Sequence, residues 1–166
     1  GMALAQVARN MALHLLLRGI GRGALVALRS DDLVVSLASI LAVGLLGGRW
    51  AGAGVEGPDL LLDTAPDGQL LPGAVLVDDT WATQPMPEAK GMFPGVAAGD
   101  DWLCLGGRWF SDASLLVRFR ADAAVFDRPE TAVVGLGGPE EPEQLLLALS
   151  TLYHGGTLVE SAEPRL

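Results

Sequence analysis

The chain has 166 residues, of which 50% are hydrophobic and 19% charged, and its formal net charge is −9. This composition indicates a globular domain with its own core and excludes a disordered segment. The acidic balance, without a cluster of Lys or Arg, argues against a nucleic-acid partner and against binding to an anionic membrane surface. The single cysteine, Cys104, excludes an internal disulfide and a cysteine-based zinc site, and it fits a cytoplasmic location.

The first part of the chain predicts a helix followed by a strand. Residues 2–18 contain good helix formers with apolar residues at helical spacing. Residues 24–28 are a strand candidate that ends at Arg29 and Ser30. The glycine-rich segment between them, residues 19–24, fits the G-x-G-x-x-G/A pattern, but that fingerprint requires a strand before it and a helix after it. We therefore interpret this segment as the end of the helix.

A second helix follows, and Asp31 or Asp32 is expected to cap it. Its apolar run, residues 33–46, has fourteen residues and is shorter than the ~20 residues that a membrane helix needs. A buried helix is the better interpretation. The glycine-rich residues 47–57 are expected to form a loop.

Two short apolar runs in the middle of the chain indicate buried strands of a parallel sheet. They are residues 60–62 and 74–77, and turn residues separate them. In parallel sheets, ligands bind in the crevice beyond the carboxyl ends of the strands. Here those ends carry polar residues, which are Asp63, Thr64, Asp78, Asp79 and Thr80.

The second half predicts an irregular segment, a strand, a helix, a strand, a helix and a short last strand. They are residues 84–99, 102–105, 113–121, 131–134, 142–153 and 157–159. The first of these helices begins at a cap formed by Ser111 or Asp112. The alternation of helices and strands indicates a single α/β domain over residues 1–166. We expect three layers with a mostly parallel sheet and flanking helices, Rossmann-like, with or without the usual first strand.

The middle of the chain resembles NAD(P)-binding Rossmann domains of the shikimate/quinate dehydrogenase and acyl-reductase group. In those domains one strand ends in a Thr/Pro turn, as residues 63–66 do here, and a Pro-Gly-apolar strand then ends in acids, as residues 72–79 do. A further strand ends in Gly-Gly, as residues 102–107 do. Arg29-Ser30 is similar to the basic pair that holds the NADP phosphate. The resemblance covers residues 3–110.

This resemblance implies an oxidoreductase that uses NADP or NAD, or a degenerate relative without catalysis. In its best register residues 2–18 are the first helix, so the first strand and its glycine-rich loop would be absent. Such a chain binds no dinucleotide, or completes its sheet through a partner. The residues that the resemblance and the strand ends assign to a cofactor are Arg29, Ser30, Thr64, Pro66, Asp78, Asp79, Thr80 and Gly106.

Two other functions stay open. Residues 74–83 resemble the phosphoribosyl-pyrophosphate motif of type I phosphoribosyltransferases, with an acidic pair followed by threonines, although Gln84 stands where glycine is expected. The apolar composition and the apparent lack of a first strand also fit a non-enzymatic α/β module that associates with itself as a homo-oligomer.

If the protein binds a small molecule, we expect the site at the carboxyl ends of the strands, and the sequence assigns no catalytic residue. We expect Asp79 or Thr80 to line a concavity bounded by Thr64 and Gly106. Cys104, between two leucines, is expected to be an inert core thiol. Neither histidine has a partner at metal-ligand spacing, so no metal site is expected. The four tryptophans are expected to cover the core.

Overall fold

The computed structural model of the protein describes residues 4–83, 93–125, 131–134, 142–153 and 157–160. The helices in these residues are α1 (Leu4–Leu17), α2 (Leu33–Leu45), α3 (Thr80–Thr83), α4 (Asp112–Val125) and α5 (Pro142–Tyr153). The strands are β1 (Leu25–Arg29), β2 (Arg49–Gly52), β3 (Leu60–Asp63), β4 (Val75–Leu76), β5 (Leu103–Leu105), β6 (Arg108–Phe110), β7 (Thr131–Val134) and β8 (Thr157–Glu160). None of the described helices is long and apolar enough to cross a membrane.

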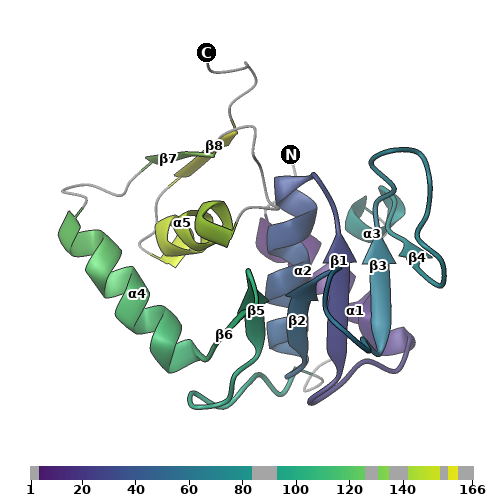
Figure 1. Ribbon diagram of the computed structural model, residues 1–166, viewed down its shortest axis with the longest axis horizontal. Coiled ribbons are helices and arrows are strands. Elements are labelled where there is room, and N and C mark those ends of the chain that lie inside the picture. Colours follow the sequence, from purple (N-terminus) through teal and green to yellow (C-terminus); the bar gives the residue numbers. More distant parts are fainter. Residues whose placement is uncertain (1–3, 84–92, 126–130, 135–141, 154–156, 161–166) are drawn as a thin grey trace.

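The main sheet has six strands in the order β4-β3-β1-β2-β5-β6 (Figure 1). Every neighbouring pair from β4 to β5 is parallel, and only the β5–β6 pair is antiparallel. The expected α/β class, with a mostly parallel sheet and flanking helices, is therefore confirmed. Strands β7 and β8 form a separate parallel pair that contacts α5, and Figure 1 shows α5 between this pair and β5.

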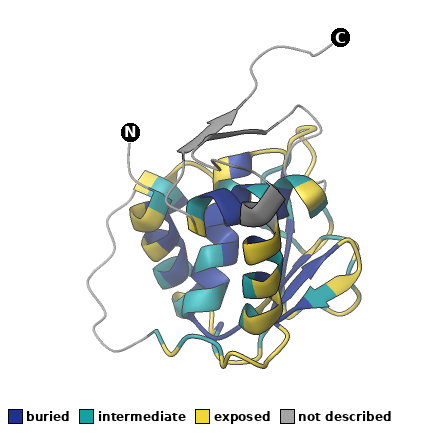
Figure 2. Cartoon of the chain, turned by 90° about the vertical axis from the view of Figure 1, so that its left-hand side faces the viewer, coloured by how far each residue is buried: buried dark blue, intermediate teal, exposed yellow. Residues whose placement is uncertain are grey.

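The core lies between the sheet and its helices. One contiguous buried cluster joins α1, α2, α4 and α5 to alternate residues of the strands, including Val26, Leu62 and Leu103. Because side chains alternate along a strand, these residues point to the same face. In Figure 2 the buried residues, in dark blue, concentrate in the strands and on the helix sides that face them.

The opposite face of the sheet carries a smaller buried cluster of Leu25, Ala51 and Cys104, against which Val55 and Trp109 pack. Val55 belongs to the short connection between the parallel strands β2 and β3, residues 53–59. Parallel strands are usually joined by a dozen or more residues that include a helix. Here the connection has seven residues and no helix, so this face is covered by the loop with Val55 and by Trp109 of β6.

The helices α2 and α4 begin at polar residues that the sequence marks as N-caps. The Asp32 carboxylate caps α2 by accepting hydrogen bonds from the N–H groups of Val34 and Val35, at 2.9 and 3.2 Å. At the start of α4, Ser111 and Ser114 each accept a hydrogen bond from the other's backbone N–H. The sequence offered two candidate caps for each helix. The structure selects Asp32 for α2 and Ser111 for α4.

Two strands were not predicted. Strand β2 lies within residues 47–57, which were expected to form a loop. The sequence did not mark it as a strand, because only Trp50 and Ala51 of its four residues are buried and the glycines Gly48 and Gly52 lie close by. Strand β6 begins with the exposed Arg108 and has no apolar alternation to mark it. Of the expected irregular segment, residues 93–99 contain no helix or strand, and residues 84–92 lie outside the described residues, as does His154.

The glycine-rich residues 19–24 join the end of α1 to the start of β1. A dinucleotide-binding loop has the reverse order, with a strand before it and a helix after it. The segment also lies at the amino end of β1, away from the edge where ligands bind parallel sheets. The interpretation as a helix end is therefore confirmed.

Candidate functional site

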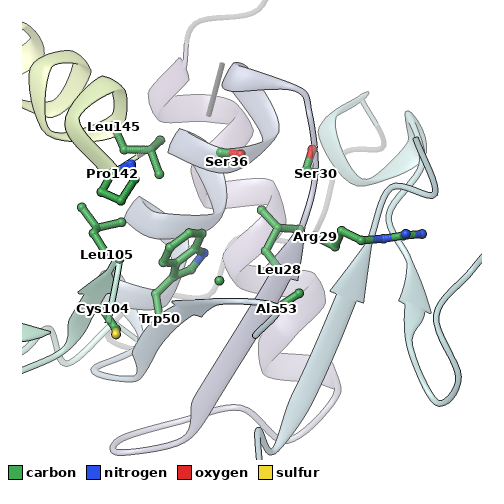
Figure 3. Close-up of a pocket in the computed structure, with 12 residues that line it drawn as sticks. Leu28, Arg29, Ser30, Ser36, Trp50, Ala53, Cys104, Leu105, Pro142 and Leu145 are labelled. Carbon is green, nitrogen blue, oxygen red and sulfur yellow. The ribbon is translucent and has the colours of Figure 1, made fainter. Parts of the chain in front are cut away.

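A cavity lies at the carboxyl ends of β1, β2 and β5, between the sheet and the helices α2 and α5 (Figure 3). We call it the β1–β2–β5 cavity, and its volume is about 260 Å³. Figure 3 shows Leu105, Pro142 and Leu145 on one side, Leu28 and Ser30 on the other, and the Trp50 ring between them. The lining residues are Leu28, Arg29, Ser30, Ser36, Trp50, Gly52, Ala53, Cys104, Leu105, Gly106, Pro142 and Leu145.

The wall of this cavity is apolar and its polar atoms are largely satisfied within the protein. Trp50 donates a hydrogen bond from Nε1 to the Ser39 hydroxyl at 3.0 Å, and Ser39 donates to the Ser36 carbonyl at 2.8 Å. The indole ring therefore presents carbon to the cavity while its N–H is held in the core. The Ser30 hydroxyl accepts a hydrogen bond from the Asp32 N–H at 3.0 Å.

Arg29 lines the cavity, but its guanidinium points away from it (Figure 3). Nε and Nη2 donate to the two carboxylate oxygens of Asp63 at 3.0 and 2.8 Å, and the guanidinium also binds Asp67. The hydrogen bonds to Asp63 raise the pKa of Arg29 further. This arrangement neutralises the charge that the sequence assigned to an NADP phosphate.

Asp63 is the most enclosed carboxylate at this edge, with a side chain that is 0% exposed. Burial alone would raise its pKa, but hydrogen bonds from Arg29 and from the N–H groups of Leu71 and Ala65 outweigh burial and lower the pKa. Because donors of the protein itself occupy both of its oxygens, this carboxylate has a structural role at the strand ends.

Cys104 cannot serve as a nucleophile in this cavity. Its neighbours Leu103 and Leu105 belong to the main core, whereas Cys104 packs with the cluster on the opposite face of the sheet. Burial raises the pKa of the thiol, which keeps it protonated. Among the described residues that line the cavity, no titratable group points inward, so its geometry suits binding rather than acid–base chemistry.

A second hollow lies at the same edge of the sheet, between the first turn of α2 and the corner where β4 leads into α3. We call it the α2–β4 groove, and its volume is about 450 Å³. Apolar residues form its floor and four aspartates stand around it. Its lining residues are Val7, Met11, Asp31, Asp32, Val34, Val35, Thr64, Leu76, Val77, Asp78, Asp79, Trp81 and Ala82.

The structure divides the predicted cofactor residues between the two hollows. Arg29, Ser30 and Gly106 line the cavity, Thr64, Asp78 and Asp79 line the groove, and the exposed Pro66 and Thr80 line neither.

The expected concavity with Thr64 and Gly106 on its two sides is not found. Strands β3 and β5 are separated by β1 and β2, so their ends lie roughly 14 Å apart at ~4.8 Å per strand. Of the two residues expected to bound this concavity, Thr64 lines the same groove as Asp79, and Gly106 does not. The sequence missed the wall that Trp50, Pro142 and Leu145 contribute, and strand β2 itself lacked the alternation that would have marked Trp50.

The end of β5 turns back at once. Gly106 and Gly107, with φ of 60° and 78°, form the two-residue turn that leads into β6. Two successive residues with positive φ are typical of the type I′ hairpin turn, which strongly prefers glycine. Because β5 ends in a hairpin, no helix follows it directly, and β5 therefore provides no cradle for a phosphate. The helix N-terminus that reaches the cavity is that of α5, which begins with Pro142, a residue without an N–H, and the acidic Glu143.

No protein-family model matches the sequence, and no curated protein matches it. Solved structures do match the fold. The o-succinylbenzoate coenzyme A synthetase of Bacillus subtilis matches 98% of this chain with a TM-score of 0.80 and 12% identity, over 40% of its own chain. A luciferase-like enzyme of the mealworm Zophobas morio matches 96% of this chain with a TM-score of 0.77 and 12% identity, over 47% of its own.

The N-terminal subdomain of Klebsiella oxytoca NpsA, in complex with 3-hydroxyanthranilyl-AMSN, matches 98% of this chain with a TM-score of 0.67 and 17% identity, over 46% of its own. This chain therefore spans less than half the length of these three structures. At these identities the likeness concerns the fold.

The comparisons correct the functional resemblance. The structural neighbours are adenylate-forming enzymes and not Rossmann dehydrogenases, so the oxidoreductase prediction is wrong. The phosphoribosyltransferase and non-enzymatic alternatives gain no support from them either. The resemblance failed because residues 60–63 and 75–76 do form paired parallel strands, a local pattern that any parallel α/β sheet can produce.

Proposed function

We propose that this chain forms the acyl-binding part of an adenylate-forming enzyme, and that the β1–β2–β5 cavity holds the apolar group of a small carboxylic acid. The observation that carries the proposal is the match of almost the whole chain to such enzymes. Among the neighbours, the Bacillus subtilis synthetase is seen with an acyl-adenylate intermediate, and the Klebsiella oxytoca subdomain with 3-hydroxybenzoyl-AMSN.

The size and chemistry of the cavity support this assignment. A space of about 150 Å³ is enough for a benzene-sized ring, and the cavity measures about 260 Å³. Trp50, Leu28 and Leu105 offer apolar contacts to such a ring, and the hydroxyls of Ser30 and Ser36 lie in the wall. An uncharged wall suits an aryl or short acyl group better than it suits phosphates.

The nucleotide requires other groups than those at this cavity. Arg29 is committed to Asp63, β5 ends in a hairpin turn, and the first turn of α5 at the cavity holds Pro142, which has no N–H, and the acidic Glu143. Binding of a triphosphate usually relies on cations or on amides at a helix N-terminus. We therefore expect the remaining half of such an enzyme to supply the phosphate contacts, and this chain to contribute the acyl site.

A thermal-shift titration of the full chain with 3-hydroxybenzoyl-AMSN tests the proposal. At about a hundred times its Kd, a ligand adds ~2.7 kcal/mol of stability, which corresponds to a rise in Tm of roughly 5–10 °C for a chain of this size. We expect a smaller rise with 3-hydroxybenzoate and none with AMP alone, because the cavity recognises the acyl group. The absence of any shift with the acyl compound would contradict the proposal.

A pair of matched variants locates the site. Ala53 is partly exposed at the wall of the cavity, and Ala97 is exposed in a different hollow, at the amino edge of the sheet. We expect Ala53→Phe to occupy the cavity and abolish the ligand-induced shift, and Ala97→Phe to leave it intact. Equal shifts in the two variants would place the ligand elsewhere.

Three earlier expectations are tested alongside. Binding of NADP or NAD stays a prediction, and NADPH belongs in the same titration as a comparison ligand. The homo-oligomer also stays a prediction, which sedimentation velocity at micromolar concentration would test. We further propose a cytoplasmic location, which the single, buried thiol of Cys104 supports; fractionation of the native host tests it.

A further inference from the structure

The α2–β4 groove has no part in the proposed acyl site, yet it exposes apolar side chains from two separate elements. Val34, on the first turn of α2, is 48% exposed, and Leu76, on the edge strand β4, is 47% exposed. Between them lie the buried side chains of Val7 and Met11 from α1. The groove therefore offers a partner an apolar floor with one half-exposed aliphatic residue on each side.

The rim of the groove is acidic. Asp31 and Asp32 precede α2, and Asp78 and Asp79 precede α3. In the part of the chain that the structure describes, no Lys or Arg forms an ion pair with any of these four carboxylates. Asp32 caps α2, and Asp78 accepts hydrogen bonds from the N–H and hydroxyl of Thr80, which lower its pKa.

These charges select the class of partner. Four carboxylates around one hollow repel anions, even at the start of a helix, where the backbone dipole alone would attract them. A second copy of this chain, which also carries a net charge of −9, would bring another acidic molecule to the same rim. A cationic segment with apolar side chains matches both the rim and the floor.

We propose that the α2–β4 groove docks a basic amphipathic peptide segment of another protein. Its Lys or Arg side chains would lie at the carboxylates of the rim. Its aliphatic side chains would cover Val34 and Leu76. The proposal does not depend on the function of the cavity, because among the residues that the structure describes the two hollows share no lining residue.

The test measures fluorescence anisotropy of a short fluorescein-labelled peptide of alternating Leu and Lys residues added to the full chain. We compare Asp31→Asn/Asp79→Asn with Asp100→Asn/Asp101→Asn, because the two double variants remove equal charge and the second pair is exposed outside the groove. In the described part of the chain, the carboxylates that accept hydrogen bonds at the starts of α2 and α3 are those of Asp32 and Asp78, and not those of Asp31 and Asp79. We expect the groove variant to weaken binding by about fivefold relative to the control variant.

The apolar half of the proposal needs its own variants. We expect Leu76→Ser to weaken binding by about tenfold, with Val34→Ser as the second variant in case Leu76→Ser does not fold. A peptide with Ser in place of Leu should bind far more weakly. Equal affinities for the two double variants, equal affinities for the two peptides, or no binding of the Leu/Lys peptide would each overturn the proposal.

Discussion

The two hollows at the carboxyl edge of the sheet have opposite chemistry. The wall of the β1–β2–β5 cavity is largely apolar and presents no charged group to it, whereas the α2–β4 groove bears four carboxylates. The end of β1 lines the cavity and Thr64, which follows β3, lines the groove, and Arg29 and Asp63 join the ends of these neighbouring strands by an ion pair. Parallel sheets bind ligands at this edge, and the difference teaches that the residues following each strand decide the chemistry of the hollow that forms there.

Loss of the Asp63 carboxylate should have the largest effect, because it removes the buried partner of the Arg29 guanidinium. Its side chain is 0% exposed and that of Arg29 is 22% exposed. Removing one partner of a buried pair costs about 3–5 kcal/mol, and we expect about 3 kcal/mol for Asp63→Ala, since water partly screens the guanidinium. Urea unfolding at neutral pH measures the loss.

Asp67→Asn is the matched control, because Asp67 binds the same guanidinium but has a side chain that is 57% exposed. We expect only a small change in its unfolding free energy. A loss as large as that of Asp63→Ala would mean that the position of Arg29, and not the burial of Asp63, sets the stability of this edge.

The same pair predicts an acid limit to stability. The folded-state pKa of Asp63 is lowered, because the hydrogen bonds from Arg29 and two backbone N–H groups outweigh burial. A lowered pKa stabilises the fold above the unfolded-state value of about 3.9, and that stability is lost as the pH falls through the folded-state pKa. The difference between wild type and Asp63→Ala should therefore be constant above about pH 5 and shrink on acidification. A constant difference in urea unfolding down to pH 2 would contradict the assignment.

The cavity has a sensitive wall where the β5–β6 hairpin meets α5. A Cβ at Gly106 would lie 2.7 Å from Cγ of Pro142, whereas a Cβ at Gly107 would meet no atom within 4 Å. Both glycines have positive φ, so both alanine variants carry strain of about 1 kcal/mol. We expect Gly106→Ala to cost about 2–3 kcal/mol in total, because the clash is added to the strain.

Ligand binding sharpens this comparison. Gly106→Ala should displace the start of α5 and weaken the thermal shift with 3-hydroxybenzoyl-AMSN, while Gly107→Ala should leave the shift unchanged. Binding of the Leu/Lys peptide to the groove should be the same in both variants. Similar losses of stability and of acyl binding in the two variants would show that α5 does not form the wall.

Sequence patterns predicted the local structure well where they were long or capped. The periodicity of residues 2–18, the Asp32 cap and the apolar run after it identified α1 and α2, and the short apolar runs identified β1, β3 and β5. The order of the strands could not be predicted, because no local pattern states that β1 and β2 lie between β3 and β5. That order divided the predicted site residues and separated Asp79 from Gly106.

The smallest predicted effect concerns the rim of the groove, where two adjacent aspartates have different roles. Asp32 accepts hydrogen bonds from two N–H groups of the first turn of α2, and loss of such a cap costs about 1 kcal/mol. Asp31 is exposed and forms none of the hydrogen bonds at this helix end among the described residues. Asp32→Ala should therefore lower the unfolding free energy by about 1 kcal/mol, and Asp31→Ala should leave it nearly unchanged. Peptide binding should weaken in both variants, because each removes one charge from the same rim. If Asp31→Ala lowered stability as much as Asp32→Ala, its carboxylate would be part of the helix end and not free to meet a cationic partner.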